Sequence, residues 1–244
     1  MNLRSKILLK AVTDYAIVVA AAPFWLAVVM VVAAVIKINE PGESVFFKQK
    51  RIGRFGRPFN CYKFRSMHKN WRKILDDYLE RNPAEVRHFA KFHKYEFDPR
   101  ITKVGGFIRR TSLDELPQLI NIIYGQMSLV GPRPERPEIA AEYEKEIPEF
   151  TMRLKMKAGL TGYAQVHGKY NTTAYDKLKL DLTYIRNYSL WMDFKLILMT
   201  PKVLFMKDAT EGIDEGMTIA GLGEKELKAE VYGKLEEFED ELSK

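Results

Sequence analysis

The stretch "TSLDELPQLINIIYGQMSLVGPRPERPE" (residues 111–138) combines two adjacent carboxylates, a short helical pattern and a proline-rich loop. Helical spacing is seen in four apolar residues: Leu116, Leu119, Ile120 and Ile123. Gly125 follows them and is suited to end a helix, because glycine adopts the left-handed conformation without strain. Asp114 and Glu115 stand ahead of these residues, and Pro117 is tolerated only near a helix start. The pattern therefore predicts a helix N-terminus that carries two acidic side chains.

The residues alone leave two interpretations of this acidic pair. Ser112 and Glu115 fit the S-x-x-E capping box, in which the acidic side chain stabilises the first turn of an ordinary helix. The alternative is a carboxylate that attacks a phosphate, because Asp can form an acyl-phosphate. Neighbouring cations favour this second interpretation, since Arg109 and Arg110 precede the pair.

The loop "GPRPERPE" (131–138) supplies further positive charge. Prolines on both sides of Arg133 restrict its backbone, which suits a fixed clamp for a phosphate group. A divalent metal between a carboxylate and a diphosphate would reduce the repulsion between an anionic nucleophile and an anionic substrate. The arrangement therefore supports phosphoryl transfer.

Other chemistries are less well supported. Glycoside hydrolysis requires two carboxyl groups about 5 Å or more apart that face each other, which sequence neighbours on one turn do not. The four histidines lack recognisable zinc-ligand spacing: His68, His88, His93 and His167. The sequence contains no GxxxxGK[ST] loop, which argues against a P-loop nucleotidase.

Composition and charge bound the class of protein. The chain has 244 residues, of which 29% are charged and 46% hydrophobic, so it can bury a core and is not a bundle of membrane spans. The net charge of +7 favours an anionic partner: nucleic acid, an acidic membrane or a phosphorylated substrate. Residues 48–73 are rich in Lys and Arg and contain no acid. The single cysteine, Cys61, rules out an intrachain disulfide, as suits a reducing compartment.

The segment "YAIVVAAAPFWLAVVMVVAAVI" (15–36) contains 22 residues without a charge. As a helix it would be about 33 Å long, enough to cross the hydrocarbon core and longer than the apolar core of a signal peptide. Pro23 near its middle predicts a kink. Basic residues flank both ends, and the positive-inside tendency places both flanks in the cytoplasm. We therefore expect a helix that enters the membrane, turns at Pro23 and returns; the alternative is a kinked single span.

The remaining patterns predict a compact, mixed α/β body that is mostly helical. Residues 39–67 alternate aromatic and basic residues between Gly and Pro breaks, which is typical of a hairpin. Residues 70–95 and 175–185 have helical spacing. Residues 190–207 mix aromatic residues, Leu and Met with lysines, which suits either an amphipathic helix in the membrane interface or a buried core helix.

Four stretches resemble the bacterial sugar transferases, which are monotopic polyprenyl-phosphate phosphoglycosyl transferases, in their small form. They are "VFFKQKRIGRFGRPFNCYKFRSM", "DPRITKVGGFIRRTSLDELPQLINIIYGQMSLVGPRPERP", "KAGLTGYAQVHGKYNT" and "LDLTYIRNYSLWMDFKLIL". The resemblance implies transfer of a sugar-1-phosphate from a UDP-sugar to a polyprenyl phosphate such as undecaprenyl phosphate, with release of UMP. This reaction would be the first membrane step in the assembly of a glycan such as an exopolysaccharide, capsule, O-antigen or glycoprotein.

The resemblance also implies roles for individual residues. Asp114 would be the nucleophile that forms a covalent phosphosugar intermediate, and Glu115 would help to hold Mg²⁺ or to position the phosphate, which makes both carboxylates candidate metal ligands. Lys63 and Arg133 fall on phosphate-binding positions of the family, and Asp181 on a further acidic position. Other candidate substrate-binding residues are basic neighbours within the same motifs: Arg65, Arg109 and Arg136.

The resemblance implies three parts of the chain. Residues 1–38 would form the re-entrant membrane helix, residues 39–207 a catalytic domain on the cytoplasmic face of the bacterial inner membrane, and residues 208–244 a tail. The family often has a serine before the proline at the helix break, whereas Ala22 precedes Pro23 here. The expected partners are a UDP-sugar, a polyprenyl phosphate and membrane lipid but no nucleic acid, and a homodimer is a possible assembly.

Two other functions are alternatives to the enzyme. One is a membrane-anchored binding protein whose basic run, residues 48–73, binds nucleic acid or anionic lipid without catalysis. This alternative gives Asp114 and Glu115 no role. The other is a relative that keeps the fold and acts as a scaffold, and the intact acidic pair argues against it. No residue in the sequence identifies the sugar.

Overall fold

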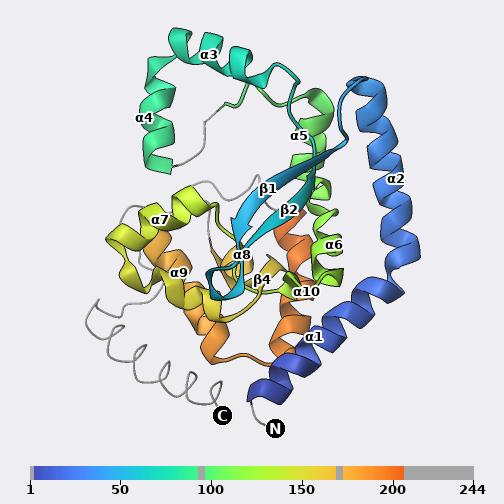
Figure 1. Ribbon diagram of the computed structural model, residues 1–244, viewed down its shortest axis with the longest axis vertical. Coiled ribbons are helices and arrows are strands. Elements are labelled where there is room, and N and C mark those ends of the chain that lie inside the picture. The colour runs from blue at the N-terminus through green and yellow to red at the C-terminus, as the bar shows by residue number, and fades with distance from the viewer. Residues whose placement is uncertain (1–2, 93–96, 169–172, 206–244) are drawn as a thin grey trace. The chain divides into compact units, whose positions relative to one another are not determined.

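The computed structural model describes residues 3–92, 97–168 and 173–205 (Figure 1). These residues form two compact units that are each described on their own. The first unit takes its described residues from 1–23, 48–62 and 118–244, and the second unit from 24–47 and 63–117. Sequence neighbours are therefore split between the units at several points.

The first unit contains a short parallel sheet surrounded by helices. Strands β3 (Met127–Val130) and β4 (Ala158–Thr161) pair in register, with Ser128 opposite Gly159. A Cβ atom on Gly159 would lie 2.1 Å from the backbone nitrogen of Gly131, so only glycine permits this approach. The surrounding elements are α1 (Leu3–Ala20), α6 (Gln118–Ile123), α7 (Pro137–Glu146), η3 (Pro148–Lys155), α8 (Tyr163–His167), α9 (Ala174–Arg186) and α10 (Leu190–Phe205).

The second unit packs helices around a small apolar core. Its described elements are most of α2 (Ala22–Asn39), α3 (Trp71–Arg81), α4 (Pro83–Phe92), α5 (Lys103–Arg110) and the single turn η2 (Leu113–Glu115). The buried core residues come from α2, strand β2 (Pro58–Phe64) and α5: Val32, Ile36, Phe64 and Ile108. Helix α5 begins at a true cap, because the Thr102 hydroxyl accepts a hydrogen bond from the Gly105 amide at 2.8 Å.

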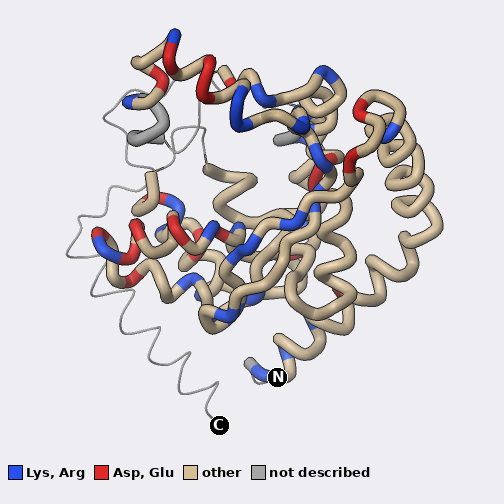
Figure 2. Tube along the Cα trace, turned by 45° about the horizontal axis from the view of Figure 1, so that its top comes forward, with Lys and Arg blue, Asp and Glu red and all other residues tan. Residues whose placement is uncertain are grey.

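The predicted hairpin is confirmed. Strands β1 (Phe46–Ile52) and β2 (Pro58–Phe64) form a two-stranded sheet joined by the short turn η1 (Arg54–Gly56). Gly56 has φ +74°, a left-handed conformation that glycine adopts without strain. Figure 2 shows Lys and Arg residues along this hairpin. The sheet therefore carries much of the basic run that the sequence places there.

The helical predictions hold with one correction. The segment predicted over 70–95 is two helices rather than one, because Asn82 precedes Pro83 and the residue before a proline is disfavoured in a helix. Helix α10 has a buried and an exposed face, since Leu196 is buried whereas Trp191 and Phe194 are exposed. It is therefore not wholly buried, and its place in a membrane interface stays a prediction. The predicted tail, 208–244, lies outside the described residues.

The apolar N-terminal segment is also interrupted earlier than expected. Helix α1 ends at Ala20 and α2 begins at Ala22, so Pro23 lies in the first turn of α2 instead of at a kink inside one helix. A proline costs little there, because the first N–H groups of a helix have no partner within it.

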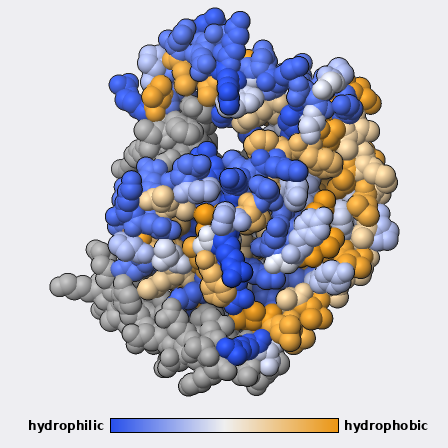
Figure 3. All heavy atoms as spheres, viewed as in Figure 1, coloured by the Kyte–Doolittle hydropathy of each residue, from blue (hydrophilic) through white to orange (hydrophobic). Residues whose placement is uncertain are grey.

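Helix α2 is the one helix among the described residues that is long and apolar enough to cross a membrane, with a mean hydropathy of 2.0. Hydrophobic atoms gather over it in Figure 3, and its exposed apolar residues include Phe24, Met30, Val31 and Ile38. Such a surface is unusual for a water-facing helix. The re-entrant path itself stays a prediction.

Candidate active site

The turn η2, which carries Asp114 and Glu115 and is called the acidic turn, forms an ion pair with strand β2. Lys63 Nζ lies 2.6 Å from Glu115 Oε1, and the two side chains are 16% and 13% exposed. A charge-assisted hydrogen bond of this length, shielded from most of the solvent, fixes both side chains. The structure therefore brings together Lys63 and Glu115, which the sequence predicted from motifs 52 positions apart.

Asp114 lies in the field of a partly buried arginine. Arg109 Nε donates to Ser66 Oγ at 2.8 Å, which holds the guanidinium in place. Burial lowers the pKa of Arg109, and the negative charge of Asp114 acts in the opposite direction. Asp114 and Glu115 thus each have a cation of the same unit nearby, Arg109 for the first and Lys63 for the second.

The backbone around the pair corrects the capping-box interpretation. Ser112 makes no side-chain capping hydrogen bond, and its φ of +54° is left-handed. Asp114 and Glu115 occupy the separate turn η2, which ends before α6 begins at Gln118. A left-handed non-glycine residue costs about 1–2 kcal/mol, and such strain clusters at functional sites. The acidic pair therefore lies in the first turn of a short 3-10 helix that follows a strained residue, and Ser112 does not cap it through its side chain.

Arg65, predicted to bind substrate, pairs with an acid in this structure. Its guanidinium lies 3.1 Å from Glu43 Oε2, in the loop after α2. Its backbone amide donates to the Val45 carbonyl at 2.8 Å. The contacts place Arg65 at the junction between α2 and the hairpin, within the second unit.

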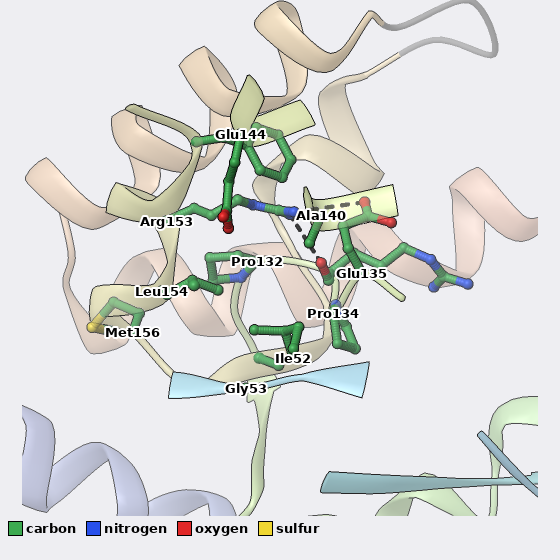
Figure 4. A pocket seen from close by; sticks show the side chains of 13 residues that line it. Ile52, Gly53, Pro132, Pro134, Glu135, Ala140, Glu144, Arg153, Leu154 and Met156 are labelled. Atoms are coloured by element: carbon green, nitrogen blue, oxygen red, sulfur yellow. Dashed lines mark hydrogen bonds and ion pairs between the residues drawn. The ribbon is translucent and has the colours of Figure 1, made fainter. Parts of the chain in front are cut away.

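The loop over residues 131–138, here called the arginine loop, belongs to the first unit. Arg153 donates to the Arg133 carbonyl at 2.9 Å, and Glu135 accepts a hydrogen bond from Lys177 at 2.8 Å. Figure 4 shows Arg153 reaching toward Glu135 beside the small pocket that the loop lines. Burial alone would raise the pKa of Glu135, but Lys177 and Arg153 together hold it below its usual value. The loop is thus fixed by partly buried hydrogen bonds and ion pairs.

Asp181, expected at a substrate-binding position, is 1% exposed and is bound to Arg153. Arg153 Nε donates to Asp181 Oδ2 at 2.8 Å. Burial raises the pKa of Asp181, and the Arg153 charge opposes that shift. In this structure Asp181 holds the arginine that holds the Arg133 backbone, so its contact with the loop is indirect.

Arg51, on strand β1, also contacts the loop. Arg51 donates to the Pro134 carbonyl at 2.9 Å and to Gln49 Oε1 at 2.6 Å. Its pKa is lowered chiefly by burial, then by the positive charge of Arg133, with Arg136 contributing in the same direction. Arg136 itself occupies the N-cap position of α7. Three guanidinium groups near one another favour an anionic ligand.

Sequence reasoning missed Arg51, Arg153 and Lys177 as parts of the site. Arg51 was visible only as one cation in a basic run. The other two residues bond to partners between 20 and 42 positions away, so no local spacing pointed to them.

The donor set of the acidic pair fits Mg²⁺. Among residues 3–92, 97–168 and 173–205 there is no group of three or more His, Cys, Asp or Glu side chains that could hold a metal by itself. Mg²⁺ commonly binds one or two carboxylates and takes its other ligands from water and substrate phosphates. Asp114 and Glu115, adjacent in one turn, supply such a pair of carboxylates.

Comparison with known proteins gives one consistent set of relatives. The chain is 46% identical over 171 residues to the galactosyl transferase CpsE of Streptococcus agalactiae, which covers 70% of this chain and 36% of that protein. It is 42% identical over 173 residues to the undecaprenyl-phosphate galactose phosphotransferase of Salmonella typhimurium, with the same coverage. The chain thus spans about a third of the length of these two relatives.

A shorter relative is matched over most of its length. The exopolysaccharide production protein ExoY of Sinorhizobium fredii is 37% identical over 171 residues, which covers 70% of this chain and 74% of that protein. The profile of the family described as "Bacterial sugar transferase" matches residues 5–207, which include every candidate site residue named above. The chain therefore belongs to the bacterial sugar transferase family.

Proposed function

We propose that this chain transfers a sugar-1-phosphate from a UDP-sugar to undecaprenyl phosphate or a similar polyprenyl phosphate, with release of UMP. The observation that carries the proposal is the acidic turn, where Glu115 is bound by Lys63 at 2.6 Å and Asp114 lies beside Arg109. Two carboxylates in different cationic surroundings can take different roles. Family membership and the names of the relatives support this choice of reaction.

We assign the nucleophile to Asp114. A carboxylate oxygen of Asp114 forms a bond to the phosphorus that carries the sugar, and the bond from that phosphorus to the bridging oxygen breaks. UMP leaves with the bridging oxygen and its electron pair. A phosphate oxygen of the polyprenyl phosphate then attacks the same phosphorus and expels the Asp114 carboxylate, which regenerates the enzyme and forms the polyprenyl diphosphosugar.

The surrounding cations lower the charge barrier of both steps. Arg109 and Lys63 offset the negative charge of the acidic pair as an anionic substrate approaches. Asp114 and Glu115 are the residues that would hold Mg²⁺, which when bound neutralises part of the diphosphate charge. In the first unit, and taken by itself, the group of Arg133, Arg51 and Arg136 suits the binding of phosphate oxygens.

The apolar helices suit a lipid acceptor whose phosphate stays at the membrane surface. Helix α2 exposes a continuous apolar surface, and α10 exposes the stacked rings of Trp191 and Phe194. Trp at such a position is typical of membrane interfaces. We propose that the catalytic part lies on the cytoplasmic face of the inner membrane, where nucleotide sugars are found.

A burst experiment tests the proposal. Purified protein is mixed with each of a panel of UDP-sugars in the absence of acceptor, and UMP is measured over time. We expect release of up to one equivalent of UMP, followed by turnover when polyprenyl phosphate is added. Release of UMP only in the presence of acceptor would favour direct transfer, and no release with any UDP-sugar would contradict the proposed reaction.

A further inference from the structure

Helix α1 has the reverse of the usual amphipathic pattern. Lys10, Asp14 and Val18, each four residues apart, are buried, and the two charged residues are only 4% and 6% exposed. Six apolar side chains of the helix are exposed instead: Leu8, Leu9, Val12, Tyr15, Ile17 and Val19. A segment that buries two charges and exposes most of its apolar residues is suited to lie between a protein and a lipid phase.

The buried charges of α1 belong to one connected cluster of the first unit. Lys10 Nζ lies 2.6 Å from Asp193 Oδ2 on α10 and 3.6 Å from Asp14 Oδ2. Tyr184 on α9 donates its hydroxyl to Asp193 Oδ1 at 2.7 Å. We call these four residues, together with Ser128, the Lys10 cluster.

Each charged member of the Lys10 cluster depends on its partners, because all of them are buried. Burial raises the pKa of Asp193, and the Lys10 charge is the largest influence that opposes it. Charges removed from water are tolerated only with well-placed partners, and removal of one partner leaves an uncompensated buried charge. Apolar contacts alone would let α1 slide or rotate, whereas these directed contacts allow one register against α9 and α10.

The cluster also reaches the strand that leads into the arginine loop. The Ser128 hydroxyl lies 2.5 Å from Asp14 Oδ2 and 2.9 Å from the Val130 carbonyl, with one proton to donate. The Tyr184 hydroxyl lies 3.4 Å from the same carbonyl. Asp14 and Tyr184 therefore contact β3 from two different helices.

Beyond Val130 the chain has little freedom before Arg133. The Gly131 amide donates to the Thr161 carbonyl at 2.9 Å, and the Pro132 carbonyl accepts from the Gly159 amide at 2.9 Å. Prolines then flank Arg133 on both sides. A displacement of β3 would therefore be passed on to Arg133 and not absorbed by a flexible linker.

We propose that Lys10, Asp14 and Ser128 are positioning residues of the arginine loop, through which helix α1 sets the place of Arg133. The membrane-facing helix would then be part of the catalytic apparatus and not only an anchor. The structural part of this inference stands on the contacts alone, whereas its catalytic consequence rests on the proposed function.

Hydrogen–deuterium exchange tests the structural part. Lys10→Gln removes the cation that holds Asp193, and Lys6→Gln is its matched control, because Lys6 is an exposed lysine one turn away on the same helix. We expect Lys10→Gln to speed exchange of the amides in residues 127–136 by about ten-fold or more, as local opening requires, with Lys6→Gln unchanged. Ser128→Ala, a smaller change, should act on the same peptide if Lys10→Gln does not fold. Unchanged exchange in residues 127–136, or a uniform increase over the whole first unit, would overturn the inference.

Kinetics on membrane-bound protein tests the catalytic part. Lys10→Gln and Ser128→Ala should lower kcat for transfer about ten-fold per folded molecule, with equal recovery in the membrane fraction, and Lys10→Arg should restore much of it. Full activity per folded molecule in Lys10→Gln would overturn the positioning role. If the unaltered protein releases no UMP from any UDP-sugar, the proposed function fails while the exchange result still decides whether α1 holds the loop.

Discussion

The acidic turn and the arginine loop are held in different ways. Around Asp114 the chain conformation comes from neighbours: Ser112 is left-handed, and the Glu115 amide donates to the Ser112 carbonyl at 3.1 Å. The arginine loop is instead held by side chains from 20 to 83 positions away, such as Arg153 and Arg51. A strained local turn carries the acidic pair, whereas hydrogen bonds and ion pairs from distant residues hold the arginine loop. Substitutions in the turn should therefore change chemistry more than stability, and substitutions behind the loop should do the reverse.

The largest effect is expected at the nucleophile. Asp114→Asn should lower steady-state UMP release by about a thousand-fold or more, because an amide is a far poorer nucleophile toward phosphorus. The free energy of unfolding should change little. Asp76→Asn, an exposed Asp on α3, serves as the control and should keep normal activity. Normal activity in Asp114→Asn would contradict the assignment of the chemistry to the acidic turn.

The next effect is expected behind the arginine loop, on stability. Arg153→Met would leave Asp181 and Glu135 buried without their shared cation, which typically costs about 3–5 kcal/mol in the free energy of unfolding. Urea denaturation measures this, with Arg81→Met, an exposed arginine at the end of α3, as control.

The loss in free energy of unfolding caused by Arg153→Met should also depend on pH. Burial already raises the pKa of Asp181, and loss of Arg153 raises it further in the folded state than in the unfolded chain. The folded variant then binds a proton more readily than the unfolded variant. The difference in free energy of unfolding between Arg153→Met and the unaltered protein should therefore shrink as pH falls. A difference that grows toward low pH would contradict the burial of an uncompensated carboxylate.

A smaller effect is expected for the cation that binds Glu115. Lys63→Gln should lower kcat/KM by about 10- to 100-fold, as for the loss of one charged group that stabilises an anionic transition state. Lys69→Gln removes a lysine that is 76% exposed and should change little. Equal effects of the two substitutions would show that general positive charge matters and that the specific 2.6 Å contact does not.

The smallest effect concerns the strain at Ser112. Its φ of +54° predicts that Ser112→Gly is more stable than Ser112→Ala by about 1 kcal/mol, because glycine adopts the left-handed conformation without a Cβ clash. At Asp76 in α3 the order should be reversed by a similar amount, since alanine favours the helix interior. Thermal unfolding of the four variants measures both differences. The same order at both positions would contradict a strained turn.

Predictions from the sequence succeeded where the signal is local. The hairpin, α6 and α9 follow from spacing and turn residues. The predicted ending of α6 at Gly125 is also seen, since the Gly125 amide donates a hydrogen bond to the Ile122 carbonyl. The capping box failed because an S-x-x-E pattern does not reveal a left-handed serine. Arg153 and the Lys10 cluster could not be predicted, because ion pairs between residues as many as 183 positions apart leave no periodicity in the sequence.

Direct detection of the covalent intermediate tests the central claim. The protein is incubated with a UDP-sugar in the absence of acceptor, quenched in acid, digested and analysed by mass spectrometry. We expect a phosphosugar adduct on Asp114 that disappears when polyprenyl phosphate is added before the quench. We expect no adduct in Asp114→Asn and an adduct in Asp76→Asn. An adduct on another residue, or transfer to polyprenyl phosphate at full rate with no adduct on any residue, would contradict the central claim.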